Sequence, residues 1–324
     1  MMNTLSENNQ PPAVTVSGLS KHFGRVRAVD DVTLTIPAGG VYGLLGPNGS
    51  GKTTLLSMLT GFLHPTAGTI SLLGETGSAG QRAARRHIGT LIERPTFWPY
   101  LSCRDNLRCL QGIYASHSGD GEIEELLATV NLDGDAATRK FRACSTGMKQ
   151  RLGIAATLLG NPSLLILDEP TNGLDPAGIV EVRELIRDLA GAASTGNGKP
   201  RTIILASHLL NEVEQVCDHV GVMARGKLLY SGPLSEMGTT SAFGRVHICT
   251  TDNERAANLL SETGWELIDQ SEDGLDVAVT PGREWEISRD LANVGVYIAE
   301  LRPLSGSLEA GFMSVTGESG GDNQ

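Results

Sequence analysis

The chain has 324 residues, more than a typical single domain, and its length predicts one large domain plus an appendage, or two domains. Its 26 basic and 37 acidic residues give a net charge of -11, which argues against nucleic acid or an anionic lipid surface as the direct partner. No apolar run approaches the roughly 20 residues of a membrane-spanning helix, and the polar start lacks the apolar stretch of a signal peptide, so we expect a cytoplasmic protein.

The order of the predicted elements indicates an α/β fold. Residues 1–12 read as a disordered tail, and the runs AVTVSGL, DVTLTI and VYGLL between 13 and about 45 predict strands of a partly antiparallel sheet. Helical patterns dominate from about 100 to 160, where Ser145 is a candidate N-cap and Gly160 a candidate end of the last helix. The runs SLLIL, TIILAS and HVGVMA then alternate with helical patterns, which predicts a parallel sheet covered by helices.

A glycine-rich phosphate-binding motif follows the strand VYGLL. The segment GPNGSGKTT comprises Gly46, Pro47, Asn48, Gly49, Ser50, Gly51, Lys52, Thr53 and Thr54, and it opens a helical run. It matches G-x-x-x-x-G-K-[ST], in which main-chain N–H groups and a helix N-terminus surround a phosphate. Lys52 is expected to reach the β and γ phosphates of a nucleotide, and the Thr53 hydroxyl to ligate Mg²⁺. We therefore expect ATP and Mg²⁺ as ligands.

Two adjacent acids end the apolar run LLIL. Asp168 and Glu169 follow it directly, and Pro170 stops the strand pattern. A charge beside an apolar core is costly unless a cation compensates it, so the pair predicts a bound metal, although a solvated strand end is the alternative. Asp168 is expected to bind Mg²⁺, and Glu169 to orient or deprotonate the attacking water.

Taken in order, these motifs resemble the ATP-binding cassette (ABC) family. The resemblance covers roughly residues 13–235, and we assign 13–238 to a nucleotide-binding domain with antiparallel and helical subdomains. The stretch CSTGMKQRLGIA looks like the family signature, which usually begins Leu-Ser-Gly-Gly-Gln; Ser145 and Gly147 are retained. Without the resemblance, the same stretch is only a capped amphipathic helix.

The resemblance implies a dimer. In the family, the signature of one cassette closes over the ATP held by the phosphate loop of the other, so Ser145 and Gly147 would contact a partner's nucleotide. Asp175 in GLDP would cross this interface, or simply cap the next helix. A second copy of this chain is the expected partner.

Three further residues are assigned by the resemblance. His208 in ILASHLL matches the switch histidine that contacts the γ phosphate, although a lone histidine at a strand end is more often structural. Phe23 in KHFG matches the aromatic that stacks on adenine; a plain core or surface aromatic is the alternative. Glu93 in LIERP stands where most cassettes place a Gln that contacts Mg²⁺ and the attacking water.

With Glu93 at this position and a signature of the STGM form, the chain resembles cassettes of the bacitracin and lantibiotic resistance type. The predicted function is ATP hydrolysis that powers export or removal of a drug or antimicrobial peptide through a separate multi-span membrane permease, which would hold this chain at the inner face of the membrane. The permease would dock near Glu93 against Phe97, Trp98 and Tyr100, unless these aromatics pack internally. The alternatives are a soluble non-transport ABC ATPase and an ATP-dependent regulator.

Residues after about 239 change character. Their runs read as strand, helix, strand, strand, helix, strand, the order of a small split-βαβ module. We assign 239–318 to this accessory α+β domain and the polar end 319–324 to disorder.

Overall fold

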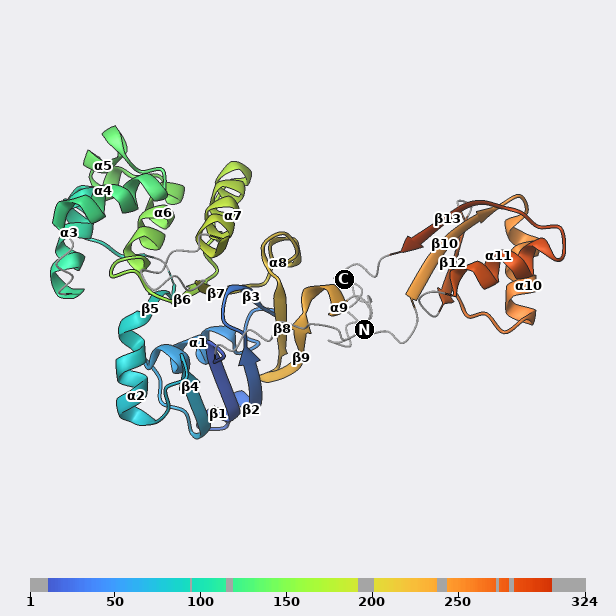
Figure 1. The fold of residues 1–324 in the computed structure, drawn as a ribbon, viewed down its shortest axis with the longest axis horizontal. Helices are drawn as coiled ribbons and strands as arrows, with labels where there is room; N and C mark the ends of the chain where they lie inside the picture. The colour runs from blue at the N-terminus through green and yellow to red at the C-terminus, as the bar shows by residue number, and fades with distance from the viewer. Residues whose placement is uncertain are drawn as a thin grey trace, which may run out of the picture. The chain divides into compact units, whose positions relative to one another are not determined.

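The computed structural model describes residues 11–93, 95–114, 119–191, 201–237, 244–271, 274–279 and 283–304. The chain forms two compact units that meet in sequence between Ser231 and Gly232 (Figure 1). Apart from positions 11 and 12, the predicted disordered ends 1–12 and 319–324 lie outside the described residues.

An antiparallel sheet begins the first unit. It contains β1 (Val14–Phe23), β2 (Val26–Ile36) and β4 (Ala67–Leu72) in the order β2-β1-β4. Val14 pairs with both Ile36 and Leu72, and all three side chains are buried. The predicted runs AVTVSGL and DVTLTI are confirmed as antiparallel strands, whereas VYGLL lies in a parallel sheet. Alternation of apolar and polar residues gives the antiparallel sheet one buried face.

A mostly parallel sheet carries the functional motifs. In the described chain it has the order β5-β6-β7-β3-β8-β9. These strands are β3 (Gly40–Leu45), β5 (Ile88–Leu91), β6 (Leu164–Asp168), β7 (Thr202–Ser207), β8 (His219–Ala224) and β9 (Lys227–Pro233). Leu45 pairs with Ser207, and Asp168 with Ala206, so β3, β6 and β7 end side by side. The phosphate loop, the acid pair and His208 therefore leave one edge of the sheet, where ligands of open α/β sheets bind.

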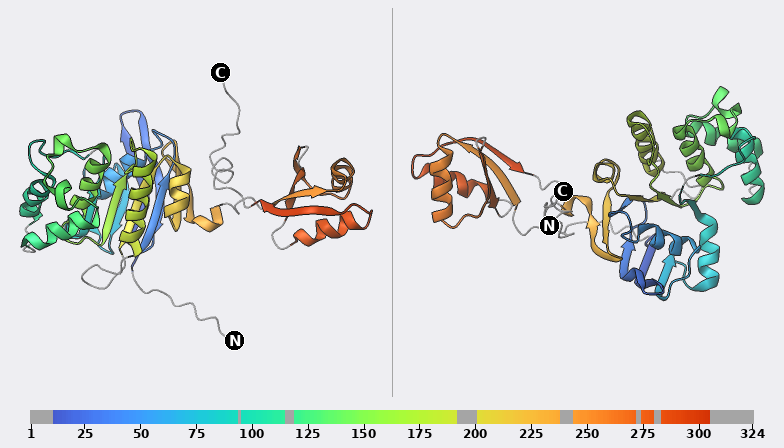
Figure 2. Two further views of the ribbon diagram at one scale, coloured as in Figure 1. Left: turned by 90° about the horizontal axis from the view of Figure 1, so that it is seen from above. Right: turned by 180° about the vertical axis from the view of Figure 1, so that it is seen from behind.

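The helices of the first unit divide between the two sheets and a helical lobe (Figures 1 and 2). They are α1 (Lys52–Thr60), α2 (Gly77–Ala84), α3 (Cys103–Tyr114), α4 (Gly119–Thr129), α5 (Gly134–Thr138), α6 (Thr146–Thr157), α7 (Pro176–Gly191) and α8 (Leu210–Val216). The short α9 (Leu234–Met237) follows the boundary and belongs to the second unit. Ser145 caps α6 by accepting a hydrogen bond from Met148 N at 3.2 Å, as its sequence position predicts. Figure 1 shows α3 to α6 together, away from β1, β2 and β4.

The main core lies between α1 and the two sheets. Leu55, Leu56 and Leu59 of α1 are buried with Leu164 and Ile166 of β6. Because α1 starts at the last residues of the phosphate loop, this packing fixes the loop against the edge where β6 ends.

The second unit is a separate α+β fold. Its elements are β10 (Gly244–Thr250), α10 (Asn253–Glu262), β11 (Leu267–Ser271), β12 (Gly274–Val279), α11 (Glu284–Ala292) and β13 (Ile298–Leu304). The antiparallel sheet has the order β11-β12-β10-β13. Its core includes Ile248, Leu260, Val277 and Ile287. The predicted split-βαβ order is thus confirmed.

Candidate functional site

The loop between β3 and α1 has the shape of a phosphate cradle. Gly51 has a φ of 107°, and a Cβ there would lie 2.4 Å from Ala28 O. A Cβ on Gly46 would lie 2.2 Å from Met223 O. Only glycine fits at these two positions, because the main chain of the loop passes so close to neighbouring segments that a side chain would clash. The N-terminus of α1 then faces the space inside the loop and favours an anion there.

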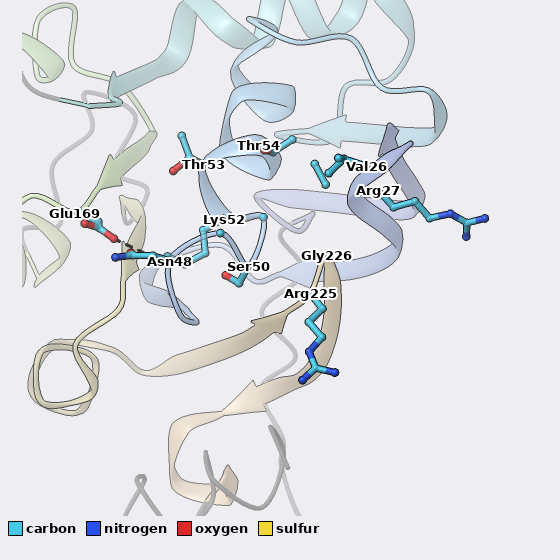
Figure 3. Close-up of a pocket in the computed structure, with 13 residues that line it drawn as sticks. Val26, Arg27, Asn48, Ser50, Lys52, Thr53, Thr54, Glu169, Arg225 and Gly226 are labelled. Atoms are coloured by element: carbon cyan, nitrogen blue, oxygen red, sulfur yellow. Dashed lines mark ion pairs between the residues drawn. The ribbon is translucent and has the colours of Figure 1, made fainter. Parts of the chain in front are cut away.

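A cavity of about 430 Å³ covers this loop. Its lining comprises Val26, Arg27, Ala28, Asn48, Gly49, Ser50, Gly51, Lys52, Thr53, Thr54, Glu169, Arg225 and Gly226 (Figure 3). Lys52 Nζ donates hydrogen bonds to Gly46 O at 2.6 Å and to Pro47 O at 3.2 Å, and it lies 4.0 Å from Glu169 Oε1. Burial lowers the pKa of Lys52, while Glu169 and Asp168 act in the opposite direction. This buried cation is thus placed to meet an anionic group that enters the cavity.

Asp168 presents an unsatisfied oxygen beside the phosphate loop. Its Oδ2 accepts a hydrogen bond from Thr53 Oγ1 at 2.7 Å, whereas its buried Oδ1 has no hydrogen-bond partner in the described part of the chain. A buried acceptor without a partner is costly, and a hard cation such as Mg²⁺ takes carboxylate and hydroxyl oxygens as ligands. Asp168 and Thr53 therefore fit a Mg²⁺ site.

Asp168→Asn is expected to stabilise the nucleotide-free protein. Burial raises the pKa of Asp168 above its usual range, with Glu169 and Glu93 adding to this effect and Thr53 opposing it. Between the unfolded and folded pKa values the folded protein binds more protons, so the free energy of unfolding falls as pH rises through that window. In EDTA at pH 7 the variant should have the higher Tm, and the difference should shrink as pH falls toward about 3.9.

Thermal unfolding across this pH range measures the effect, with Asp188→Asn on the exposed part of α7 as the matched control. If the Tm of Asp168→Asn at pH 7 is at or below that of the unmodified protein, the buried carboxylate of Asp168 does not destabilise the nucleotide-free fold, and the prediction is wrong.

Glu169 adopts a strained backbone conformation, with a φ of 47°. Its Oε1 lies 3.0 Å from His208 Nδ1, and its Oε2 accepts a hydrogen bond from Asn172 Nδ2 at 3.2 Å. A left-handed glutamate persists only where its surroundings hold it, and such residues are frequent at functional sites. The carboxylate is thus held at the wall of both cavities.

Glu93 joins these acids in a second cavity, of about 290 Å³. Asn48, Thr53, Glu93, Gln150, Asp168, Glu169 and Asn172 line it. Glu93 also has a left-handed φ, of 66°, and is exposed. The carboxylates of Glu93, Asp168 and Glu169 therefore share one cavity next to the phosphate loop, although in the described residues they are not close enough together to form a three-carboxylate metal site.

Other predicted residues do not line either cavity. Phe23 is 49% exposed and pairs across the β1–β2 hairpin with Val26, which does line the first cavity. Ser145 is exposed at the start of α6, close in sequence to the half-buried Gly147. Asp175 Oδ1 accepts a hydrogen bond from Gly178 N at 3.2 Å, so the capping alternative for Asp175 is present in the structure. The other roles assigned to these residues remain predictions.

Two residues of the second cavity escape the sequence reasoning, as do five of the first: Val26, Arg27, Ala28, Arg225 and Gly226. Asn172 bonds to Glu169, and the buried Gln150 belongs to α6, within the signature stretch itself. The position of Asn172, three residues after Glu169, gives a weak signal, whereas nothing in the sequence around Gln150 indicates that α6 turns this side chain toward Asp168.

Comparisons with known proteins agree with this geometry. The family model described as ABC transporter matches residues 29–172. The bacitracin transport ATP-binding protein of Bacillus licheniformis is 36% identical over 308 residues, which cover 94% of this chain and 97% of the relative. The chain belongs to the ABC transporter family. A lantibiotic transport ATP-binding protein of Streptococcus pyogenes is 40% identical over 214 residues, 66% of this chain and 88% of the relative.

A solved ATP-binding subunit of an ABC transporter has the same fold as the nucleotide-binding part. It superposes with a TM-score of 0.61 at 27% identity and covers 70% of this chain and 92% of that chain. The predicted P-loop core and the assignment as an ABC ATPase that binds and hydrolyses ATP are confirmed. Among the described residues of this ABC protein, no helix is both long and apolar enough to cross a membrane.

Proposed function

We propose that this ABC ATPase powers export or removal of a drug or antimicrobial peptide through a separate membrane permease. The main support is the alignment with the bacitracin transport protein, which covers 94% of the chain and so includes most of the second unit. The lantibiotic relative supports the same substrate class. A soluble non-transport ATPase or regulator is disfavoured, because both of these relatives are named as transport proteins.

In this proposal, ATP lies with its phosphates in the loop from Gly46 to Thr54. Lys52 compensates the negative charge of the β and γ phosphates, and the N-terminus of α1 adds positive potential. Thr53, Asp168 and Glu93 would hold Mg²⁺, which would supply Lewis-acid charge stabilisation when bound. Glu169 accepts a proton from the attacking water, while His208 fixes the Glu169 carboxylate and faces the γ phosphate.

The proposal includes a dimer of identical chains. Ser145 and Asp175 are exposed and lie outside the lining of both cavities, which is compatible with their contacting the nucleotide of a second copy. Ser145 already presents a capped helix N-terminus, a ready site for an anion.

The permease would bind at the aromatic segment before α3 and hold the ATPase at the inner face of the membrane. Phe97 packs edge-on against Phe141 at 5.2 Å, whereas Trp98 and Tyr100 are 47% and 71% exposed. Exposed Trp and Tyr side chains are typical anchors of protein interfaces, so these two carry the docking proposal and Phe97 supports them from within.

The double variant Trp98→Ala/Tyr100→Ala is expected to lose binding of the permease but to keep binding of ATP. Each truncated interface aromatic costs about 1–2 kcal/mol, so co-purification from membranes should fall at least about tenfold. The measurement is the yield of permease captured by the tagged ATPase, with Trp285→Ala on the second unit as control. Full capture by the double variant would place the docking site elsewhere.

Coexpression of the chain with the membrane protein encoded beside it tests the function itself. Survival should increase against at least one member of a panel of cell-wall antibiotics, and Glu169→Gln in the same pair should abolish this protection. Protection that persists in the Glu169→Gln pair, or no protection with a folded and assembled pair, would count against the proposal.

A further inference from the structure

Glu212 is a buried carboxylate behind the candidate site. It lies in α8, and the residue is 2% exposed. Ser207 Oγ donates a hydrogen bond to its Oε2 at 2.7 Å, and Thr171 Oγ1 donates to its Oε1. Thr171 and Ser207 are themselves buried, at 5% and 1% exposed. One carboxylate therefore connects the loop after β6 with the end of β7.

Both hydroxyl partners are next to proposed catalytic residues. Thr171 comes two residues after Glu169, and Ser207 directly precedes His208. On the cavity side, Glu169 and His208 contact each other at 3.0 Å. The two loops are thus joined twice, once at the surface of the site through Glu169 and His208, and once underneath through Glu212.

The hydroxyl of Ser207 has a defined orientation. Its oxygen accepts a hydrogen bond from Leu209 N at 3.0 Å, and it donates to Glu212 at 2.7 Å, a shorter contact than the 3.5 Å to Leu209 O. The short loop around His208 is therefore held at its base by a chain of hydrogen bonds that ends at the Glu212 carboxylate. A change in the position of α8 would move this loop and the loop of Thr171 together.

Stability does not explain this carboxylate. In the described chain, no ion pair involves Glu212, and two neutral hydroxyl groups compensate a buried carboxylate less well than a cation does. An acid near the N-terminus of α8 would interact with the helix dipole equally well from an exposed position. The exposed Glu214 shows that α8 accepts an acidic side chain at its surface. Buried polar groups of this kind are retained in some proteins because they specify one arrangement.

We propose that Glu212 is a positioning residue that holds the loops of Glu169 and His208 in one fixed relative arrangement. The inference depends on the catalytic roles proposed above for Glu169 and His208. Glu212 itself does not line either cavity. Its effect would be on the alignment of Glu169, and hence on turnover more than on ATP binding.

Three variants of the full chain separate this role from a structural one. Glu212→Gln keeps the shape and one oxygen acceptor, whereas Glu212→Leu with Thr171→Val replaces the carboxylate and one hydroxyl by apolar groups. Glu214→Gln, two residues along α8, is the exposed control. ATPase kinetics, ATP binding and Tm are measured for each.

The double variant is expected to lose about ten- to a hundredfold in kcat, with KM for ATP within about twofold, because a small misplacement of a catalytic group lowers turnover without removing the binding contacts. Its Tm should stay equal or rise, since apolar replacement of a buried charge is often neutral or stabilising. Glu212→Gln should recover part of kcat, and the control should match the unmodified protein.

Unchanged kcat in both Glu212 variants would overturn the inference, provided that Glu169→Gln is inactive in the same assay. Parallel losses of Tm, ATP affinity and kcat would assign Glu212 a structural role and overturn it as well. Normal turnover of Glu169→Gln would instead refute the proposed base, so the two failures are distinguishable.

Discussion

Glu169→Gln is expected to bind ATP normally and to hydrolyse it at least about a hundredfold more slowly, since losing a general base costs at least this much. The amide preserves the size of the side chain that faces Lys52 and His208, but it cannot accept the proton of the attacking water. If ATP joins two copies of the chain, the uncleaved nucleotide should also keep them together. ATPase kinetics and size-exclusion chromatography with ATP measure both effects.

Glu184→Gln on the exposed part of α7 is the matched control and should behave as the unmodified protein. Near-normal turnover by Glu169→Gln would assign the base to another residue, with Glu93 the first candidate because it lines the same cavity. Slow turnover without an accumulated dimer would keep the base and reject the proposed dimer.

Lys52→Ala is expected to weaken ATP binding itself. Lys52 is 5% exposed and is the cation nearest to Glu169 at the phosphate loop. Hydrogen bonds to charged groups contribute about 1.5–3 kcal/mol, so the Kd for ATP should rise at least about tenfold. Turnover at saturating ATP should fall as well, because Lys52 also compensates charge that develops on the phosphates.

Titration with a fluorescent ATP analogue measures this change, and Lys227→Ala on exposed β9 is the control. The Tm of nucleotide-free Lys52→Ala must be compared too, because Lys52 also donates hydrogen bonds to Gly46 O and Pro47 O. Unchanged ATP affinity in a folded variant would remove Lys52 from the phosphate site.

The sequence by itself determined the nucleotide-binding core and its family. The phosphate loop is contiguous in sequence and needs glycine where the chain curls, so its residues appear as one motif. Asp168 and Glu169 are equally visible, because charge at the end of a fully buried strand is unusual. The C-terminal element order was also readable, since strand and helix periodicities differ along that segment.

Only the tertiary structure decided which distant residues meet at the site. Alignment of β3, β6 and β7 brings His208 to Glu169, although 39 residues separate them. The orientation of α6 places Gln150 in the cavity with Asp168, and that of α8 buries Glu212 between Thr171 and Ser207. Gln150 and Glu212 are polar residues of helices, and local patterns cannot say which polar residue a helix turns inward. That choice depends on the packing of helices against a sheet assembled from segments far apart in the chain.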